Sequence, residues 1–162
     1  MKKQNNILNV IISDLQLSTQ LKVILLILER YNCRAGEVLA AKRSLFIPGR
    51  MLILKGSKHS NDVIVRDLNI LSLIEQLPLL DQDLLFPSVH YQSLYRHVKK
   101  NYSHLFIKYK TKKNYKVTHG FRFLNANLIN DPASVKSILN HASQASGTYY
   151  NSQLPRTKYL KH

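Results

Sequence analysis

One segment constrains the fold of this chain more than any other: a dense aliphatic run near its N-terminus, LKVILLILERYN at residues 21–32. Ser18 stands just before it, and serine is a preferred N-cap because its hydroxyl accepts a hydrogen bond from a backbone N–H of the first helical turn. We therefore predict a buried helix that begins after Ser18 and ends near Asn32. Its longest uninterrupted apolar stretch, residues 23–28, falls far below the roughly 20 residues that span a bilayer, so the helix belongs to a core.

Helical patterns continue through most of the chain, because apolar residues recur at helical spacing between capping residues and prolines. We place these further helices at about residues 35–42, 68–77, 88–104, 119–130, 131–142 and 146–154. A different pattern separates the first two of them. Pro48-Gly49 and the polar run at residues 56–62 are turn signals around the apolar segments MLIL and VIVR. This stretch predicts a small antiparallel sheet, and LLFP at residues 84–87 predicts a short extended piece.

The expected fold class is therefore mainly α with a small antiparallel β-sheet, an α+β domain. A length of 162 residues allows one ordinary domain, and a hydrophobic content of 44% is enough to build its core. We expect an N-terminal arm or helix at residues 1–17, the domain at residues 18–152 and a C-terminal tail at residues 153–162.

The charge balance points to a polyanionic partner. Lys and Arg number 24 against 9 Asp and Glu, which gives a formal net charge of +15 and a sequence pI of about 10.0. Such a surface favours nucleic acid, although ribosomal, chromatin and membrane-surface proteins share it. The single cysteine, Cys33, excludes an internal disulfide and favours a reducing compartment, so we expect the cytoplasm.

Four separated segments carry the chemistry when they are read together: CRAGE at 33–37, LKGSK at 54–58, THGFR at 118–122 and LNHASQASGTYY at 139–150. Each is a weak signal alone, since a lone arginine, histidine or tyrosine is more often structural. In chain order they supply Arg34, Lys55, His119, Arg122, His141 and Tyr150. This set resembles the catalytic residues of the tyrosine recombinase and phage integrase family.

The resemblance covers about residues 18–152 and extends to spacing. The family's first arginine begins a helix and has a glutamate three residues later, as Arg34 does with Glu37. The family's lysine lies in a lysine-glycine pair on a β-hairpin, like Lys55, and its histidine-x-x-arginine motif is similar to HGFR. Its tyrosine follows the second histidine by nine residues, as Tyr150 follows His141.

Elementary chemistry assigns roles that agree with the resemblance. Attack of a phenol on a phosphodiester builds negative charge on two non-bridging oxygens, which arginine forks bind bidentately. We assign this role to Arg34 and Arg122, with His119 and His141 as further donors. A free phenol has a pKa of about 10, so nearby cations must help Tyr150 lose its proton. By resemblance, Lys55 protonates the departing deoxyribose oxygen.

The resemblance implies a site-specific DNA recombinase or integrase that cleaves and rejoins strands through a covalent 3′-phosphotyrosyl intermediate. It implies no cofactor and no metal. The implied partner is double-stranded DNA at the nucleoid, with no membrane, and the protein is expected as a monomer in solution and a homotetramer on paired DNA sites. Mobile-element integration, excision or inversion is the implied process. Two alternatives stay open: a non-catalytic DNA-binding protein or recombinase remnant of the same fold, and a type IB topoisomerase.

The chain departs from the family pattern in several ways. Asn140 replaces the usual glycine before the second histidine, and Phe123 follows Arg122 where histidine or tyrosine is common. Lys58 lies on the same predicted turn as Lys55 and is an alternative general acid. The first 17 residues are too short for the family's N-terminal clamp domain, which leaves a minimal recombinase, a fragment or a degenerate remnant. A set of lysines is expected to contact DNA phosphates: Lys58, Lys110, Lys112, Lys113 and Lys116.

Overall fold

The computed structural model describes residues 17–57, 60–78, 83–105 and 120–122. Its elements in chain order are α2 (Thr19–Tyr31), α3 (Ala35–Leu39), the 3₁₀ turn η1 (Arg43–Leu45), β1 (Phe46–Ile47), β2 (Met51–Leu54), β3 (Val63–Val65), α4 (Leu68–Glu75) and α5 (Tyr91–Tyr102). Helices dominate, and the strands form one three-stranded antiparallel sheet in the order β1-β2-β3. The predicted fold class is confirmed.

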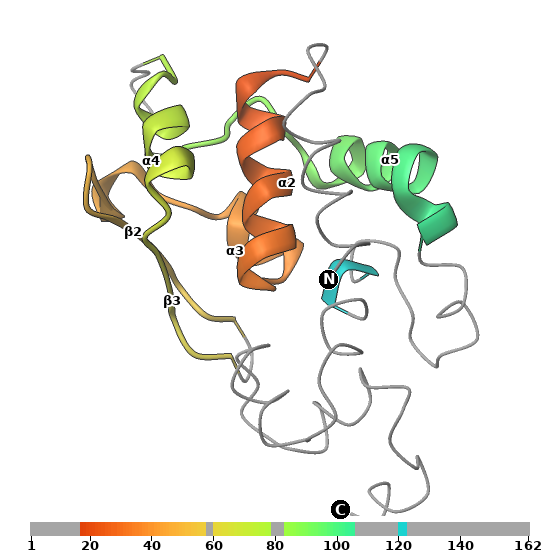
Figure 1. Ribbon diagram of the computed structural model, residues 1–162, viewed down its shortest axis with the longest axis horizontal. Coiled ribbons are helices and arrows are strands. Elements are labelled where there is room, and N and C mark those ends of the chain that lie inside the picture. Colours follow the sequence, from red (N-terminus) through yellow and green to blue (C-terminus); the bar gives the residue numbers. More distant parts are fainter. Residues whose placement is uncertain (1–16, 58–59, 79–82, 106–119, 123–162) are drawn as a thin grey trace, which may run out of the picture.

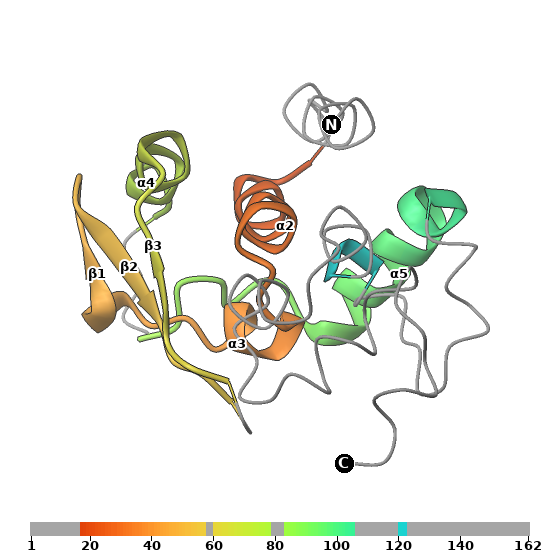
Figure 2. The ribbon, with the colours of Figure 1, turned by 60° about the horizontal axis from the view of Figure 1, so that its bottom comes forward.

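Helix α2 is the centre of the core. Figures 1 and 2 show it between α4 and α5, with α3 near its C-terminal end. Residues 23–28 are all buried, so the helix is covered on all sides along this stretch. Its predicted bounds are confirmed: the Ser18 hydroxyl accepts the N–H of Leu21 at 3.2 Å, and Asn32 ends the helix in the left-handed conformation.

The sheet packs one face against this core. Leu52 of β2 pairs with Phe46 of β1 and with Val65 of β3. Leu52 and Leu54 are fully buried while Met51 and Ile53 are half-buried, the period-two alternation of a sheet with one covered face. The two strands predicted from MLIL and VIVR are present. The short β1 is an addition that the sequence patterns did not indicate.

The chain after α3 differs from expectation. The second helix was predicted at about residues 35–42, but it ends at Leu39. Lys42 instead forms an isolated antiparallel bridge with Leu84, and the Ala41 carbonyl accepts the N–H of Leu85 at 3.0 Å. The backbone groups after Ala40 therefore bond to a distant extended segment, which overrides local helical propensity. That segment is the extended piece predicted from LLFP.

Helix α5 connects the core to residues 120–122, which are also helical. It was predicted at residues 88–104 and covers the shorter range Tyr91–Tyr102. Leu94 and Val98 are fully buried, and the ring of Tyr102 packs against Phe121 with centroids 5.8 Å apart. This contact secures the segment that carries Arg122. Among the helices within these described ranges, none is long and apolar enough to cross a membrane.

Candidate functional site

The junction between α2 and α3 is the structural centre of the candidate site. Asn32 ends α2 with φ of 59°, and Arg34 is the extended N-cap residue of α3. Cys33, between them, points into the core and is 3% exposed. Three consecutive residues therefore connect the two helices and place Arg34 at the start of α3.

Arg34 is held by a carboxylate of its own helix. Glu37 Oε1 lies 3.4 Å from Arg34 Nη1 and also accepts the backbone N–H of Arg34 at 3.4 Å. The side chain of Glu37 is 2% exposed and that of Arg34 is 22% exposed. The buried carboxylate therefore orients the guanidinium of Arg34, while the Arg34 side chain stays partly exposed to solvent.

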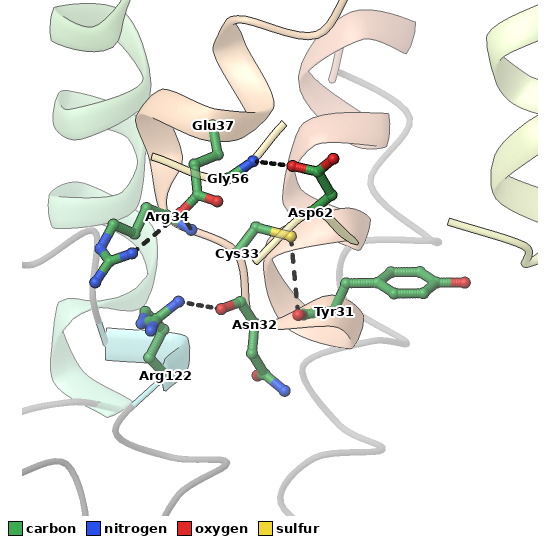
Figure 3. Close-up of polar contacts among 8 residues, drawn as sticks. All are labelled: Tyr31, Asn32, Cys33, Arg34, Glu37, Gly56, Asp62 and Arg122. Carbon is green, nitrogen blue, oxygen red and sulfur yellow. Dashed lines mark hydrogen bonds and ion pairs between the residues drawn. The ribbon is translucent and has the colours of Figure 1, made fainter. Parts of the chain in front are cut away.

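Arg122 reaches the same junction from a distant part of the chain. Its guanidinium donates a hydrogen bond to the main-chain carbonyl of Asn32, two residues before Arg34, as Figure 3 shows. The residue is only 1% exposed and is among the largest fully buried side chains. The structure thus brings Arg34 and Arg122, 88 positions apart in sequence, to one three-residue segment.

Cys33 is chemically inert in this setting. The pKa of its thiol is raised to about 12, mainly by burial and also by the nearby Glu37 carboxylate, while Arg122 acts in the opposite direction. A thiol with this pKa stays protonated at physiological pH, and the thiolate is the reactive form. Cys33 is therefore a small buried residue of the core.

Lys55 lies on the hairpin after β2. Its ammonium pairs with Asp62 Oδ2 at 3.1 Å, and Asp62 Oδ1 accepts the N–H of Gly56 at 2.9 Å. The hydrogen bond from Gly56, followed by that from Lys55, holds the pKa of the Asp62 carboxyl below its ordinary value. The side chain of Lys55 is 67% exposed. Of the described candidates, the structure joins Arg34 and Arg122 at one junction and leaves Lys55 paired on the hairpin.

Glycine is required beside this lysine. A Cβ atom at Gly56 would lie 2.2 Å from the carbonyl oxygen of Ser60, well inside van der Waals contact with rigid backbone. The lysine-glycine pair noted in the sequence therefore has a steric origin in the close approach of the two hairpin arms.

Known proteins match this chain in three-dimensional structure, whereas the comparisons of sequence find no match. No protein-family model and no curated protein sequence matches the chain. The catalytic domain of bacteriophage HP1 integrase aligns with 94% of this chain and 88% of its own length, with a TM-score of 0.55 and 16% identity. XerA recombinase aligns with 99% of this chain, with a TM-score of 0.61 and 20% identity. XerH recombinase, in a post-cleavage complex with palindromic difH substrate, also aligns with 99%, with a TM-score of 0.68 and 19% identity.

This chain has the fold of a tyrosine recombinase catalytic domain. It spans 63% of the XerA chain and 50% of the XerH chain. At identities of 16–20% the likeness concerns the recombinase fold, and the chemistry has to be argued from this chain's own residues.

Part of the predicted site lies outside the residues that the structure describes. Three predicted catalytic residues lie there: His119, His141 and Tyr150. The predicted phosphate-contacting lysines lie there too: Lys58, Lys110, Lys112, Lys113 and Lys116. Among the described residues, no group of three or more His, Cys, Asp or Glu side chains gathers in a way that could hold a metal ion.

Two residues of the candidate site were not singled out from the sequence. Asn32 supplies the acceptor for Arg122, and Asp62 supplies the partner of Lys55. An asparagine at the end of a predicted helix is a recognisable signal for a left-handed cap. The Asp62 contact has no comparable local signal, because it depends on how the two hairpin arms meet.

Proposed function

We propose that this chain is a site-specific DNA recombinase that cleaves and rejoins strands through a covalent 3′-phosphotyrosyl intermediate on Tyr150. The observation that carries the proposal is the meeting of Arg34 and Arg122 at the α2–α3 junction. Two guanidinium groups that meet at one junction could together bind a phosphodiester, because each can bind non-bridging oxygens through a planar fork. The fold shared with XerH, which was captured with a DNA substrate, supports the same conclusion.

The proposed reaction balances with the chain's own residues and solvent. The phenol of Tyr150 loses its proton to solvent, the phenolate attacks phosphorus, and the bond from phosphorus to the 5′ oxygen breaks. Arg34 and Arg122 stabilise the charge that develops on the non-bridging oxygens, with His119 and His141 as additional donors. Lys55 donates its proton to the leaving 5′ oxygen. A second strand's 5′-hydroxyl then attacks the phosphotyrosine and returns its proton to Lys55. The departing phenolate takes a proton from solvent, which restores the tyrosine, and the DNA is rejoined.

The proposal places two requirements on the described residues. Arg122 is buried and bound to a carbonyl, so DNA binding has to bring its guanidinium within reach of the phosphate. Lys55 is paired with Asp62, so the phosphate or leaving oxygen has to compete with that carboxylate. The exposed position of Lys55 makes the second requirement easy to meet, since exposed ion pairs are weak.

The proposed partner is double-stranded DNA, bound at the nucleoid through the excess of basic residues. The formal charge of +15 supports this electrostatic attraction. We propose further that four copies assemble on paired sites and act in mobile-element integration, excision or inversion. The lysines at 110–116 and Lys58 are the proposed phosphate contacts.

Covalent capture tests the proposal directly. Full-length protein is incubated with nicked, fragmented genomic DNA of its source, denatured with detergent, and any protein-linked fragments are recovered and sequenced. The wild type is expected to yield adducts at defined sites. Tyr150→Phe removes one oxygen and should abolish them, whereas Tyr149→Phe is the matched control and should keep them. Adducts that persist in Tyr150→Phe would exclude this nucleophile, and a wild type that forms none would exclude the enzyme.

A second candidate is a DNA-binding protein with this fold that does not cleave. The burial of Arg122 and its bond to the Asn32 carbonyl favour it, since an arginine engaged in this way acts as a structural group. Saturable DNA binding together with complete absence of adduct would support this candidate over the recombinase.

A further inference from the structure

Asn32 has an unusual backbone conformation at the centre of the site. Its φ of 59° is the only positive φ among the non-glycine residues that the structure describes. A residue with a side chain disfavours this left-handed region, and asparagine is one of the few that tolerate it. Asn32 is also buried. A strained conformation in the core persists only where the surroundings hold it in place.

The left-handed turn determines where the Asn32 carbonyl points. A residue that continued α2 would direct its carbonyl along the helix axis toward the next turn. At Asn32 the chain leaves the helix, Cys33 enters the core and Arg34 becomes extended, while the Asn32 carbonyl receives the Arg122 guanidinium (Figure 3). The acceptor for Arg122 is therefore created by the backbone conformation of Asn32.

We infer that Asn32 is a positioning residue: its left-handed conformation aims its carbonyl at Arg122 and thereby places Arg122 relative to Arg34. The catalytic consequence rests on the proposed recombinase function, whereas the hydrogen bond itself does not. Because the carbonyl is two residues before Arg34, any change in the turn moves the Arg122 acceptor and the N-cap of α3 together.

The inference makes the backbone, and not the amide side chain, the essential feature of Asn32. Asn32→Gly removes the side chain but keeps easy access to positive φ, so it should preserve the position of Arg122. Asn32→Ala retains a Cβ and loses the tolerance of asparagine, so it should shift the junction toward helical or extended conformations. Asn32→Val makes the same change more severely, because β-branched residues at positive φ are genuine outliers.

Gly49 supplies the matched control. It has φ of 71° in the turn between β1 and β2, and a Cβ there would meet nothing within 4 Å. Gly49→Ala therefore introduces the same type of backbone strain away from Arg34 and Arg122. It should lower stability without changing either arginine.

Two measurements test the inference, and the first needs no DNA. The guanidinium N–H hydrogens of Arg122 are assigned by NMR, by comparison with an Arg122→Lys variant, and their exchange with solvent is measured. Exchange should be slow in the wild type, Asn32→Gly and Gly49→Ala, and faster by roughly 5- to 30-fold in Asn32→Ala, the factor that corresponds to the left-handed penalty. Circular dichroism establishes that each variant is folded. If Asn32→Gly exchanges as fast as Asn32→Ala, the side-chain amide is responsible and the inference is wrong.

The second measurement is the rate of adduct formation on the fragments that the wild type captures. Asn32→Ala should slow this rate while its affinity for the same fragments stays unchanged, and Asn32→Gly should restore it. A wild type without adduct but with the expected exchange pattern would overturn the recombinase and leave the positioning of Arg122 intact. Normal adduct formation in Asn32→Ala, or unchanged exchange of Arg122, would overturn the inference while the recombinase stands.

Discussion

Replacement of Glu37 by glutamine should loosen the junction that holds Arg34. The carboxylate is almost fully buried and accepts both the backbone N–H and the guanidinium of Arg34, each at 3.4 Å. Hydrogen bonds to charged groups contribute about 1.5–3 kcal/mol, and contacts this long belong at the lower end. Glutamine keeps one acceptor oxygen and loses the charge, so we expect Glu37→Gln to reduce the free energy of unfolding by about 1–2 kcal/mol.

Two further variants make this prediction specific. Glu37→Ala removes both acceptors and should be more destabilising than Glu37→Gln. Glu75→Gln makes the same chemical change at an exposed position of α4 and should stay within about 0.5 kcal/mol of the wild type. Thermal unfolding followed by circular dichroism should place Glu37→Gln about 2–8 °C below the wild type, at roughly 2–4 °C per kcal/mol for a chain of this size.

The ordering of the variants decides whether Glu37 acts through Arg34. If Glu37→Gln melts with the wild type and Glu75→Gln, the contact between Glu37 and Arg34 contributes nothing and the reasoning fails. If Glu37→Gln is as unstable as Glu37→Ala, the loss comes from the buried amide and not from the missing charge. Within the proposed recombinase, the adduct rate should fall in the same order as stability, because Arg34 loses its orientation.

Three other predictions concern the hairpin and two of the lysines expected to contact DNA. The pKa of the Asp62 carboxyl is lowered in the folded state, so its stabilising effect is present above the ordinary value of 3.8 and is lost as pH falls through the folded value. Hydrogen exchange at the Gly56 amide should therefore accelerate below pH 3.8 in the wild type. The Asp62→Asn variant should lack this acceleration. Gly56→Ala forces a Cβ to within 2.2 Å of the Ser60 carbonyl and should open the hairpin, seen as loss of its cross-strand NMR contacts; an unchanged hairpin spectrum would show that the arms separate easily. Neutralising Lys112 and Lys113 should flatten the dependence of DNA affinity on salt without altering sequence preference, whereas a changed preference would mean that these lysines contact bases.

Local signals predicted those parts of the fold that local chemistry determines. Ser18 and Asn32 marked the two ends of α2 because capping depends on residues within one turn. The sheet followed from turn signals, and glycine at position 49 does adopt the positive φ that such a turn requires. The failure at residues 40–42 has the opposite cause, since backbone groups of residues 41–43 bond to residues 83–85, some 40 positions away.

The candidate site shows the same difference between features set by neighbouring residues and contacts between distant parts of the chain. The position of Arg34 at a helix start was expected from its sequence neighbours, and the structure has it as the N-cap of α3. The acceptor of Arg122 lies 90 residues from it, and no pattern within one segment indicates such a contact. Residue types could therefore be selected from the sequence, but the main-chain carbonyl that receives Arg122 could come only from the folded arrangement.

The C-terminal turn of α2 connects the two halves of the site. The Tyr31 hydroxyl accepts the N–H groups of Arg66 and Asp67, at 3.1 and 2.9 Å, which fixes the chain just after β3. The next residue, Asn32, binds Arg122. Since β3 is one arm of the hairpin that carries Lys55, adjacent residues of one helix end hold both the strand behind the proposed general acid and an arginine of the proposed phosphate cradle. Displacement of this helix end would therefore move both Lys55 and Arg122. Its packing in the core fixes the position of one group relative to the other.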